Sequence, residues 1–76
     1  MEIALSELKA KEKGEIVTLK AKGEIRRRLL DMGLVKGVQI TVVRKAPLGD
    51  PIEINLKGFN LSLRKEEAQS IVVNKL

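Results

Sequence analysis

The sequence predicts a mainly β protein, in which about five short strands and one or two short helices form a small, partly open barrel. Three runs in the second half of the chain alternate apolar and polar residues, and this period of two is typical of half-buried strands. Turn signals separate the runs, and a glycine follows a short amphipathic helix in the first half. Short strands in a chain of 76 residues would leave exposed edges unless the sheet closes on itself. We therefore expect an SH3-like barrel, with an oligonucleotide-binding barrel as the alternative.

The first quarter of the chain is expected to hold one helical turn and one strand. Residues 5–8 read Leu-Ser-Glu-Leu, and Ser6 is placed to cap the turn that they form. Residues 15–21 predict the first strand. Its expected inward positions are Val17, Leu19 and Ala21, with Ile16 out of phase at the start.

A helix of about two turns is predicted over residues 24–32. Ile25, Leu29 and Met32 recur at helical spacing and are expected to face the barrel. Gly33 follows the last turn, where a left-handed backbone conformation costs glycine little.

The second half of the chain predicts three strands, then a helical turn within residues 63–69 and a closing strand at 71–73. Lys57 and Gly58 indicate a short hairpin, and the two prolines of residues 47–51 indicate a longer turn outside the strands. The positions expected to face the core are Val38, Ile40 and Val42, then Ile52, Ile54 and Leu56, then Phe59, Leu61 and Leu63.

Composition favours one small folded domain, residues 1–76, and limits its chemistry. The apolar fraction is 43%, cysteine and histidine are absent, and no apolar run exceeds three residues. We therefore expect no signal peptide, no membrane span and no thiolate or imidazole chemistry. The adjacent acids Glu66 and Glu67 point about 100° apart on a helix, so they are expected to be exposed charges and not a metal chelate. Neither catalysis, a cofactor nor a metal site is expected.

The net charge of +5 lies mainly in residues 9–28, where eight Lys or Arg stand against three Glu. Such a segment either covers a small barrel with solvated lysines or binds an acidic protein, an anionic membrane or a nucleic acid. Base stacking needs aromatic platforms, and the single aromatic residue, Phe59, is in phase with core positions. The sequence therefore makes nucleic acid the weaker candidate.

Leu30 and Leu34 fall off the inward stripe of the predicted helix and stand near its arginines. An apolar pair rimmed by arginine predicts either the centre of a protein interface or a plug for the open end of the barrel. The expected partner-binding residues are Arg27, Arg28, Leu30, Met32 and Leu34.

Several short motifs follow one another along nearly the whole chain. They are Leu5-Ser6-Glu7-Leu8, Gly14 with Ile16, Arg28-Leu29-Leu30-Asp31-Met32-Gly33-Leu34 with Gly37, Gly49-Asp50-Pro51-Ile52, Leu61-Ser62-Leu63-Arg64, and Glu67-Ala68 before Ile71 and Val73. In this order and spacing the chain resembles the FeoA family of bacterial ferrous iron uptake. One departure is Val35-Lys36, which stands where the family often has a proline before the second glycine.

The resemblance implies an SH3-like barrel that acts with FeoB, a membrane ferrous iron transporter with a cytoplasmic G-protein domain. It implies a non-catalytic accessory or regulatory role in the cytoplasm, with recruitment to the inner face of the cell membrane. Transition metal ion binding is implied only at the level of the family, and no residue of this chain is assigned to it. Binding of RNA or the ribosome by a small basic barrel is the alternative function.

Overall fold

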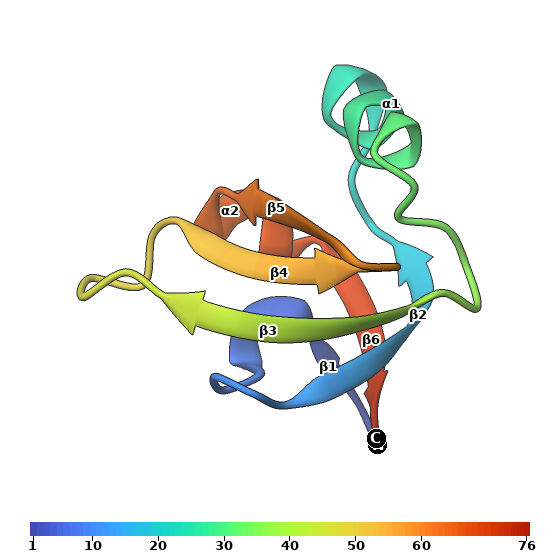
Figure 1. Ribbon diagram of the computed structural model, residues 1–76. Helices are drawn as coiled ribbons and strands as arrows, with labels where there is room; N and C mark the ends of the chain where they lie inside the picture. The colour runs from blue at the N-terminus through green and yellow to red at the C-terminus, as the bar shows by residue number, and fades with distance from the viewer.

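The computed structural model describes residues 1–76 as one curved antiparallel sheet with two short α-helices and a 3-10 turn (Figure 1). The elements in chain order are β1 (Glu2–Ala4), η1 (Leu5–Glu7), β2 (Lys13–Leu19), α1 (Gly23–Asp31), β3 (Gln39–Lys45), β4 (Ile52–Leu56), β5 (Phe59–Leu63), α2 (Lys65–Gln69) and β6 (Ile71–Lys75). The strands lie in the order β1-β6-β2-β3-β4-β5. The predicted mainly β fold is confirmed, with six strands where about five were expected.

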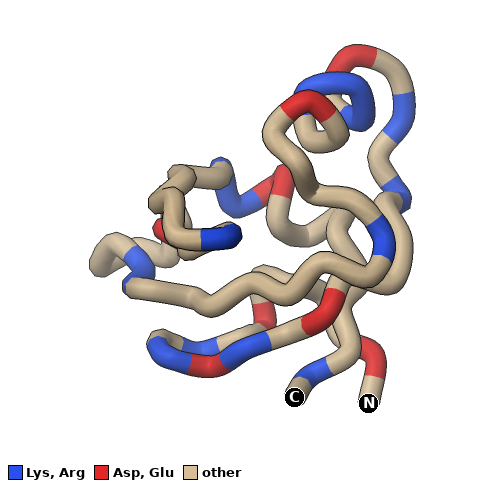
Figure 2. The backbone as a smooth tube through the Cα atoms, turned by 45° about the vertical axis from the view of Figure 1, so that its right-hand side comes forward, with Lys and Arg blue, Asp and Glu red and all other residues tan.

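The sheet is open between its outer strands, β1 and β5, which do not pair with each other. The turn η1 follows β1, the helix α2 follows β5, and these two elements pack against each other. Strand β1 was not predicted because three residues carry no periodic pattern. The backbone N–H of Lys75 donates to the carbonyl of Met1 at 3.0 Å, so the two ends of the chain lie side by side (Figure 2).

Strand β2 begins and ends two residues earlier than predicted and contains a β-bulge. Its register against β6 shifts between Ile16 and Thr18. The extra residue shifts the alternation of inward and outward side chains by one position. Ile16 and Leu19 are therefore buried, while Val17 is only half-buried. The prediction that Val17 faces the core is therefore wrong.

The strands β3, β4 and β5 follow the predicted alternation except at one position. Ile40, Val42, Ile52, Ile54, Leu56 and Leu63 are buried, and Val38 and Leu61 are half-buried. Phe59 is 72% exposed, because it begins the outermost strand directly after the hairpin turn. Lys57 and Gly58 form that turn with φ of 50° and 88°, which is the left-handed pair that a two-residue hairpin requires. The hairpin prediction is confirmed, and the prediction that Phe59 packs in the core is wrong.

Residues 5–8 form the predicted helical turn, but Ser6 does not cap it. The residue at the N-cap is Ala4, and no side chain caps the turn. Leu5 and Leu8 are fully buried, so packing holds the turn in place. The carbonyl of Ser6 accepts a hydrogen bond from Lys45 Nζ at 2.6 Å, which fastens the turn to the end of β3.

Candidate docking site at the α1 end of the barrel

Helix α1 ends in a turn that buries the leucine after it. Gly33 has a φ of 93°, its N–H donates to the carbonyl of Leu30 at 2.9 Å, and the N–H of Leu34 donates to the carbonyl of Leu29 at 3.1 Å. This pair of bonds is the Schellman motif, in which the apolar residue after the glycine packs against the last turns of the helix. Leu29 and Leu34 are both fully buried. Of the two alternatives for Leu34, its burial agrees with a plug for the end of the barrel, and its assignment as a partner-binding residue is wrong.

The outer surface of α1 is apolar as well as basic. Ile25 is 43% exposed, although its spacing predicted that it faces the barrel, because α1 meets the sheet mainly through its C-terminal turn. Leu30 is 38% exposed, as expected for a surface position. Met32 is half-buried and packs against the core. Arg27 is exposed and takes part in no salt bridge.

Two arginines of α1 fasten the helix to the barrel. Arg26 Nη1 donates to the carbonyl of Leu19 at the end of β2, at 3.0 Å. Arg28 Nη1 lies 3.1 Å from Glu67 Oε2 on α2, and about half of the Arg28 side chain remains exposed. Arg28 is thus a structural tie as well as a candidate contact for a partner.

Glu67 is the one buried charged residue of the chain, whereas the sequence predicted an exposed helix charge. Its side chain is 4% exposed, its Oε1 accepts the backbone N–H of Arg64 at 2.9 Å, and its Oε2 pairs with Arg28. The carboxylate thus turns back to the start of α2, where an unpaired N–H needs an acceptor. The neighbour Glu66 is exposed, as predicted.

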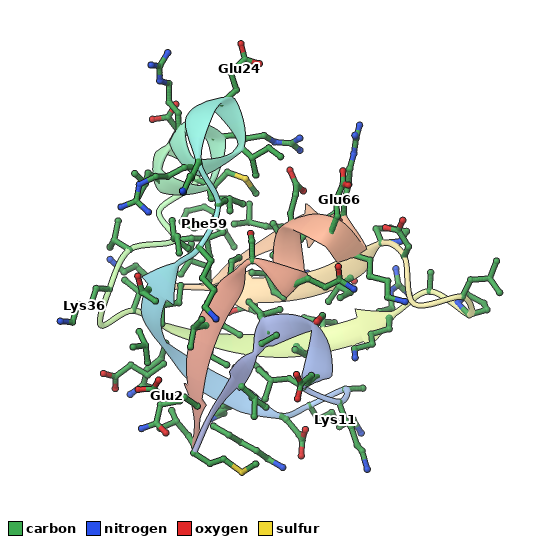
Figure 3. All side chains as sticks on the ribbon, turned by 180° about the vertical axis from the view of Figure 1, so that it is seen from behind. Glu2, Lys11, Glu24, Lys36, Phe59 and Glu66 are labelled. Atoms are coloured by element: carbon green, nitrogen blue, oxygen red, sulfur yellow. The ribbon has the colours of Figure 1, made fainter.

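An open apolar groove lies between the end of α1 and the β4–β5 hairpin. Its volume is about 360 Å³, and its lining is Met32, Gly33, Leu56, Lys57, Phe59, Asn60 and Leu61. Figure 3 shows Phe59 below α1, on the same side of the molecule. A larger hollow of about 770 Å³ beside α2 is lined only by polar residues and proline. The groove near α1 is therefore the surface feature best suited to hold an apolar side chain.

The sequence predicted contact residues on the α1 side of this groove but none on the β5 side. Of the expected partner-binding residues, Met32 lines the groove, while Arg27, Arg28 and Leu30 lie on the helix above it. Phe59 and Leu61 form the second wall, and both were assigned to the core. Leu56, on the other side of the same turn, is buried, so the exposure of Phe59 comes from its place on the edge strand β5, which no local pattern in the sequence marks.

The basic residues of the first third do not form one patch. Residues 9–13 lie at the end of the barrel away from α1, and residues 20–28 lie on and beside α1 (Figures 2 and 3). At the first end, Glu12 pairs with Lys75 Nζ at 2.8 Å and accepts the N–H of Lys9 at 2.7 Å. These contacts, first of all that with Lys75, lower the pKa of Glu12 below its ordinary value. Lys9, Lys11 and Lys13 take part in no salt bridge, and neither do Lys20, Lys22 and Arg27, so unpaired positive charge lies at both ends of the barrel.

No three His, Cys, Asp or Glu side chains are grouped so that they could hold a metal ion. No helix has the length and apolar character that crossing a membrane requires. What the α1 end presents is an apolar groove with cationic side chains beside it.

Known proteins share this fold and sequence. The chain is 45% identical over 69 residues to the Fe(2+) transport protein A/Fe(2+) transporter FeoB fusion protein of Porphyromonas gingivalis, a match that covers 91% of this chain and 8% of the fusion protein. The solution structure of an FeoA-like protein from Clostridium acetobutylicum superposes with a TM-score of 0.91 at 43% identity, covering 99% of this chain and 87% of that one. The crystal structure of Stenotrophomonas maltophilia FeoA complexed with zinc, described as a prokaryotic SH3 domain protein, has a TM-score of 0.81 at 32% identity and covers 97% and 89%.

These likenesses confirm the predicted SH3-like fold and the resemblance on which the functional expectations depend. The family model for the FeoA domain matches residues 3–75. The chain therefore belongs to the FeoA family, whose members take part in ferrous iron transport.

Proposed function

We propose that this chain is a non-catalytic, cytoplasmic accessory protein of ferrous iron uptake that docks onto the cytoplasmic part of FeoB, at the inner face of the membrane. The observation that carries the proposal is the open apolar groove at α1, in a chain whose Porphyromonas gingivalis relative is fused to FeoB. Fusion of two domains in one organism indicates that they work side by side.

The position of the chain ends supports docking through the α1 end. Met1 and Leu76 lie together at the pole away from α1 (Figure 2). A linker attached to either end would therefore leave the groove uncovered. In a fused protein such a linker would also hold the groove near the transporter at a high effective concentration.

The contacts that we assign to docking combine apolar and charged side chains. Met32 and Phe59 offer an apolar cleft, and Leu30 extends the apolar surface onto the helix. Arg27 and Arg28 stand beside this surface and suit carboxylates on the partner. Leu34 packs against the end of α1 and is completely buried, so it does not contact the partner directly.

Docking can regulate a transporter without any chemistry of its own. A protein that binds one state of its partner more tightly than another shifts the balance between those states by the difference in affinity. Binding measured with and without a GTP analogue would show whether the nucleotide state of FeoB changes this affinity.

The test uses the full chain and the purified cytoplasmic part of FeoB in a calorimetric titration. Leu30→Asp and Arg27→Glu are expected to weaken binding at least about tenfold, because each alters the centre of the interface. Arg27 is preferred to Arg28, since Arg28 also holds Glu67.

The matched controls carry the same substitutions at positions away from α1, in the β3–β4 loop and before β2 (Figure 1). Leu48→Asp, at a side chain that is 90% exposed, and Lys11→Glu should change the affinity less than about twofold. Melting curves establish that each variant is folded. Equal affinity for all four variants and the natural chain would refute docking through α1.

Exposure of Phe59 also favours a second candidate, RNA binding by stacking on this one aromatic ring. Such binding would depend steeply on salt and would be insensitive to the presence of FeoB. Filter binding of RNA at about 50 mM salt tests it, and absence of retention would remove this candidate.

A further inference from the structure

Strand β5 leaves one side of its backbone unpaired. It is an outer strand of the sheet and pairs only with β4. The two-residue turn at Lys57–Gly58 makes Leu56 and Phe59 a hydrogen-bonded pair, and such pairs alternate along an antiparallel ladder. The N–H and C=O groups of Asn60 and Ser62 therefore point away from β4. No other backbone hydrogen bond engages them, and both residues are exposed.

This free edge adjoins the apolar groove. Phe59, Asn60 and Leu61 belong both to β5 and to the lining of the groove. An extended segment that paired with Asn60 and Ser62 would lie along the groove, and every second side chain would point to one face. One apolar side chain in phase with Phe59 and Leu61 would then fill the hollow beside Met32.

The charges along the edge indicate the composition of the added segment. Residues 56–65 contain Lys57, Arg64 and Lys65 and no acidic residue. An added strand with carboxylates near both of its ends would match these charges. A second copy of β5 would not, because antiparallel pairing centred on Leu61 would place Lys57 opposite Lys65.

We propose that an extended acidic segment of the partner adds to β5 as a seventh strand, with its backbone on Asn60 and Ser62 and one apolar side chain in the groove. The inference rests on the proposed docking function and specifies its binding mode. Main-chain hydrogen bonds would supply affinity, and the groove would select the central side chain.

The experiment follows amide hydrogen exchange of the full ¹⁵N-labelled chain with two probes. One probe is the purified cytoplasmic part of FeoB. The other is a synthetic seven-residue peptide, Asp-Thr-Val-Thr-Leu-Thr-Glu, compared with the same peptide carrying lysine at both ends. Strand addition predicts that exchange at Asn60 and Ser62 slows at least about tenfold with FeoB and with the acidic peptide, and not with the lysine peptide.

Two variants separate backbone pairing from side-chain contact. Ser62→Pro removes the outward N–H at an edge position where proline is tolerated, whereas Ser62→Ala keeps the N–H. We expect the proline variant to bind about tenfold more weakly and the alanine variant to bind within about twofold of the natural chain. Melting curves check that both are folded.

The outcomes distinguish this inference from the function on which it rests. FeoB binding without protection of Asn60 and Ser62, or with equal affinity for the proline and alanine variants, would overturn strand addition and leave docking intact. Absence of FeoB binding by every variant would overturn the docking function. Absence of protection with both probes would overturn the strand inference itself.

Discussion

The two leucines on either side of the Met32–Gly33 turn differ in what they do. Leu34 is 0% exposed and packs after the helix end, whereas Leu30 is 38% exposed on the surface of α1. Truncating each to alanine therefore separates support of the fold from contact with a partner. We expect Leu34→Ala to destabilise the domain strongly and Leu30→Ala to affect it weakly.

The magnitude follows from burial. A fully buried leucine replaced by alanine costs about 3 to 5 kcal/mol, through lost apolar burial and the cavity left behind. A domain of this size has a total stability of about 4 to 11 kcal/mol, so Leu34→Ala removes a large share of it. Each kcal/mol lowers the melting temperature by about 4 to 8 °C, and the expected fall is at least about 12 °C. For the partly exposed Leu30, about 1 kcal/mol or less is expected.

Far-UV circular dichroism is the suitable signal, because the chain has no Trp and no Tyr. Urea and thermal unfolding of both variants would be compared with those of the natural chain. If Leu34→Ala melted within about 4 °C of the natural chain, or if Leu30→Ala lost as much stability, the packing assigned to the helix end would be wrong.

Two further predictions concern the acidic residues that make ion pairs. Glu67→Gln keeps an acceptor for the N–H of Arg64 and removes the charge that faces Arg28. Unfolding experiments should therefore show a free energy of unfolding lower by about 1 kcal/mol. An unchanged free energy of unfolding would mean that solvent fully screens the half-exposed pair. Contact with Lys75 lowers the pKa of Glu12. The stabilisation of the fold by Glu12 is therefore present above the ordinary pKa of 4.5, and it is lost as pH falls through the lower pKa of the folded state. Urea midpoints of the natural chain and Glu12→Gln should therefore converge as pH falls from 7 to 3, and a constant difference would contradict the assignment.

Local patterns in the sequence predicted most of the fold. Strands with one buried face carry their period of two whatever lies around them, so the runs at β3 and β4 could be assigned from sequence. The hairpin could be assigned because Lys57 and Gly58 suit the left-handed conformations that it needs. Features that depend on residues far away in the sequence could not be predicted from local patterns. The bulge near Ile16 exists only in relation to β6, and the burial of Glu67 depends on Arg28 of another helix.

One error at the candidate site could have been avoided from the sequence. A glycine directly after a helix predicts the Schellman turn, and that turn places the next apolar residue against the helix. Gly33 was assigned correctly, so the burial of Leu34 followed from the same motif. Exposure of Phe59 was harder to foresee, because its phase agrees with Leu61 and Leu63 and only the end of the sheet sets it apart.

The docking surface stands on a helix that depends on few contacts. A helix of nine residues is marginal in water by itself, so α1 needs the barrel to keep its shape. Leu29 is its only fully buried side chain, and Arg26 and Arg28 supply its polar ties. Helix α1 should therefore open locally at a lower free energy than the sheet, and its amides should exchange before those of β3. Binding has to hold α1 in place, so a substitution that stiffens the helix without touching the groove should tighten binding by lowering the entropy lost on docking.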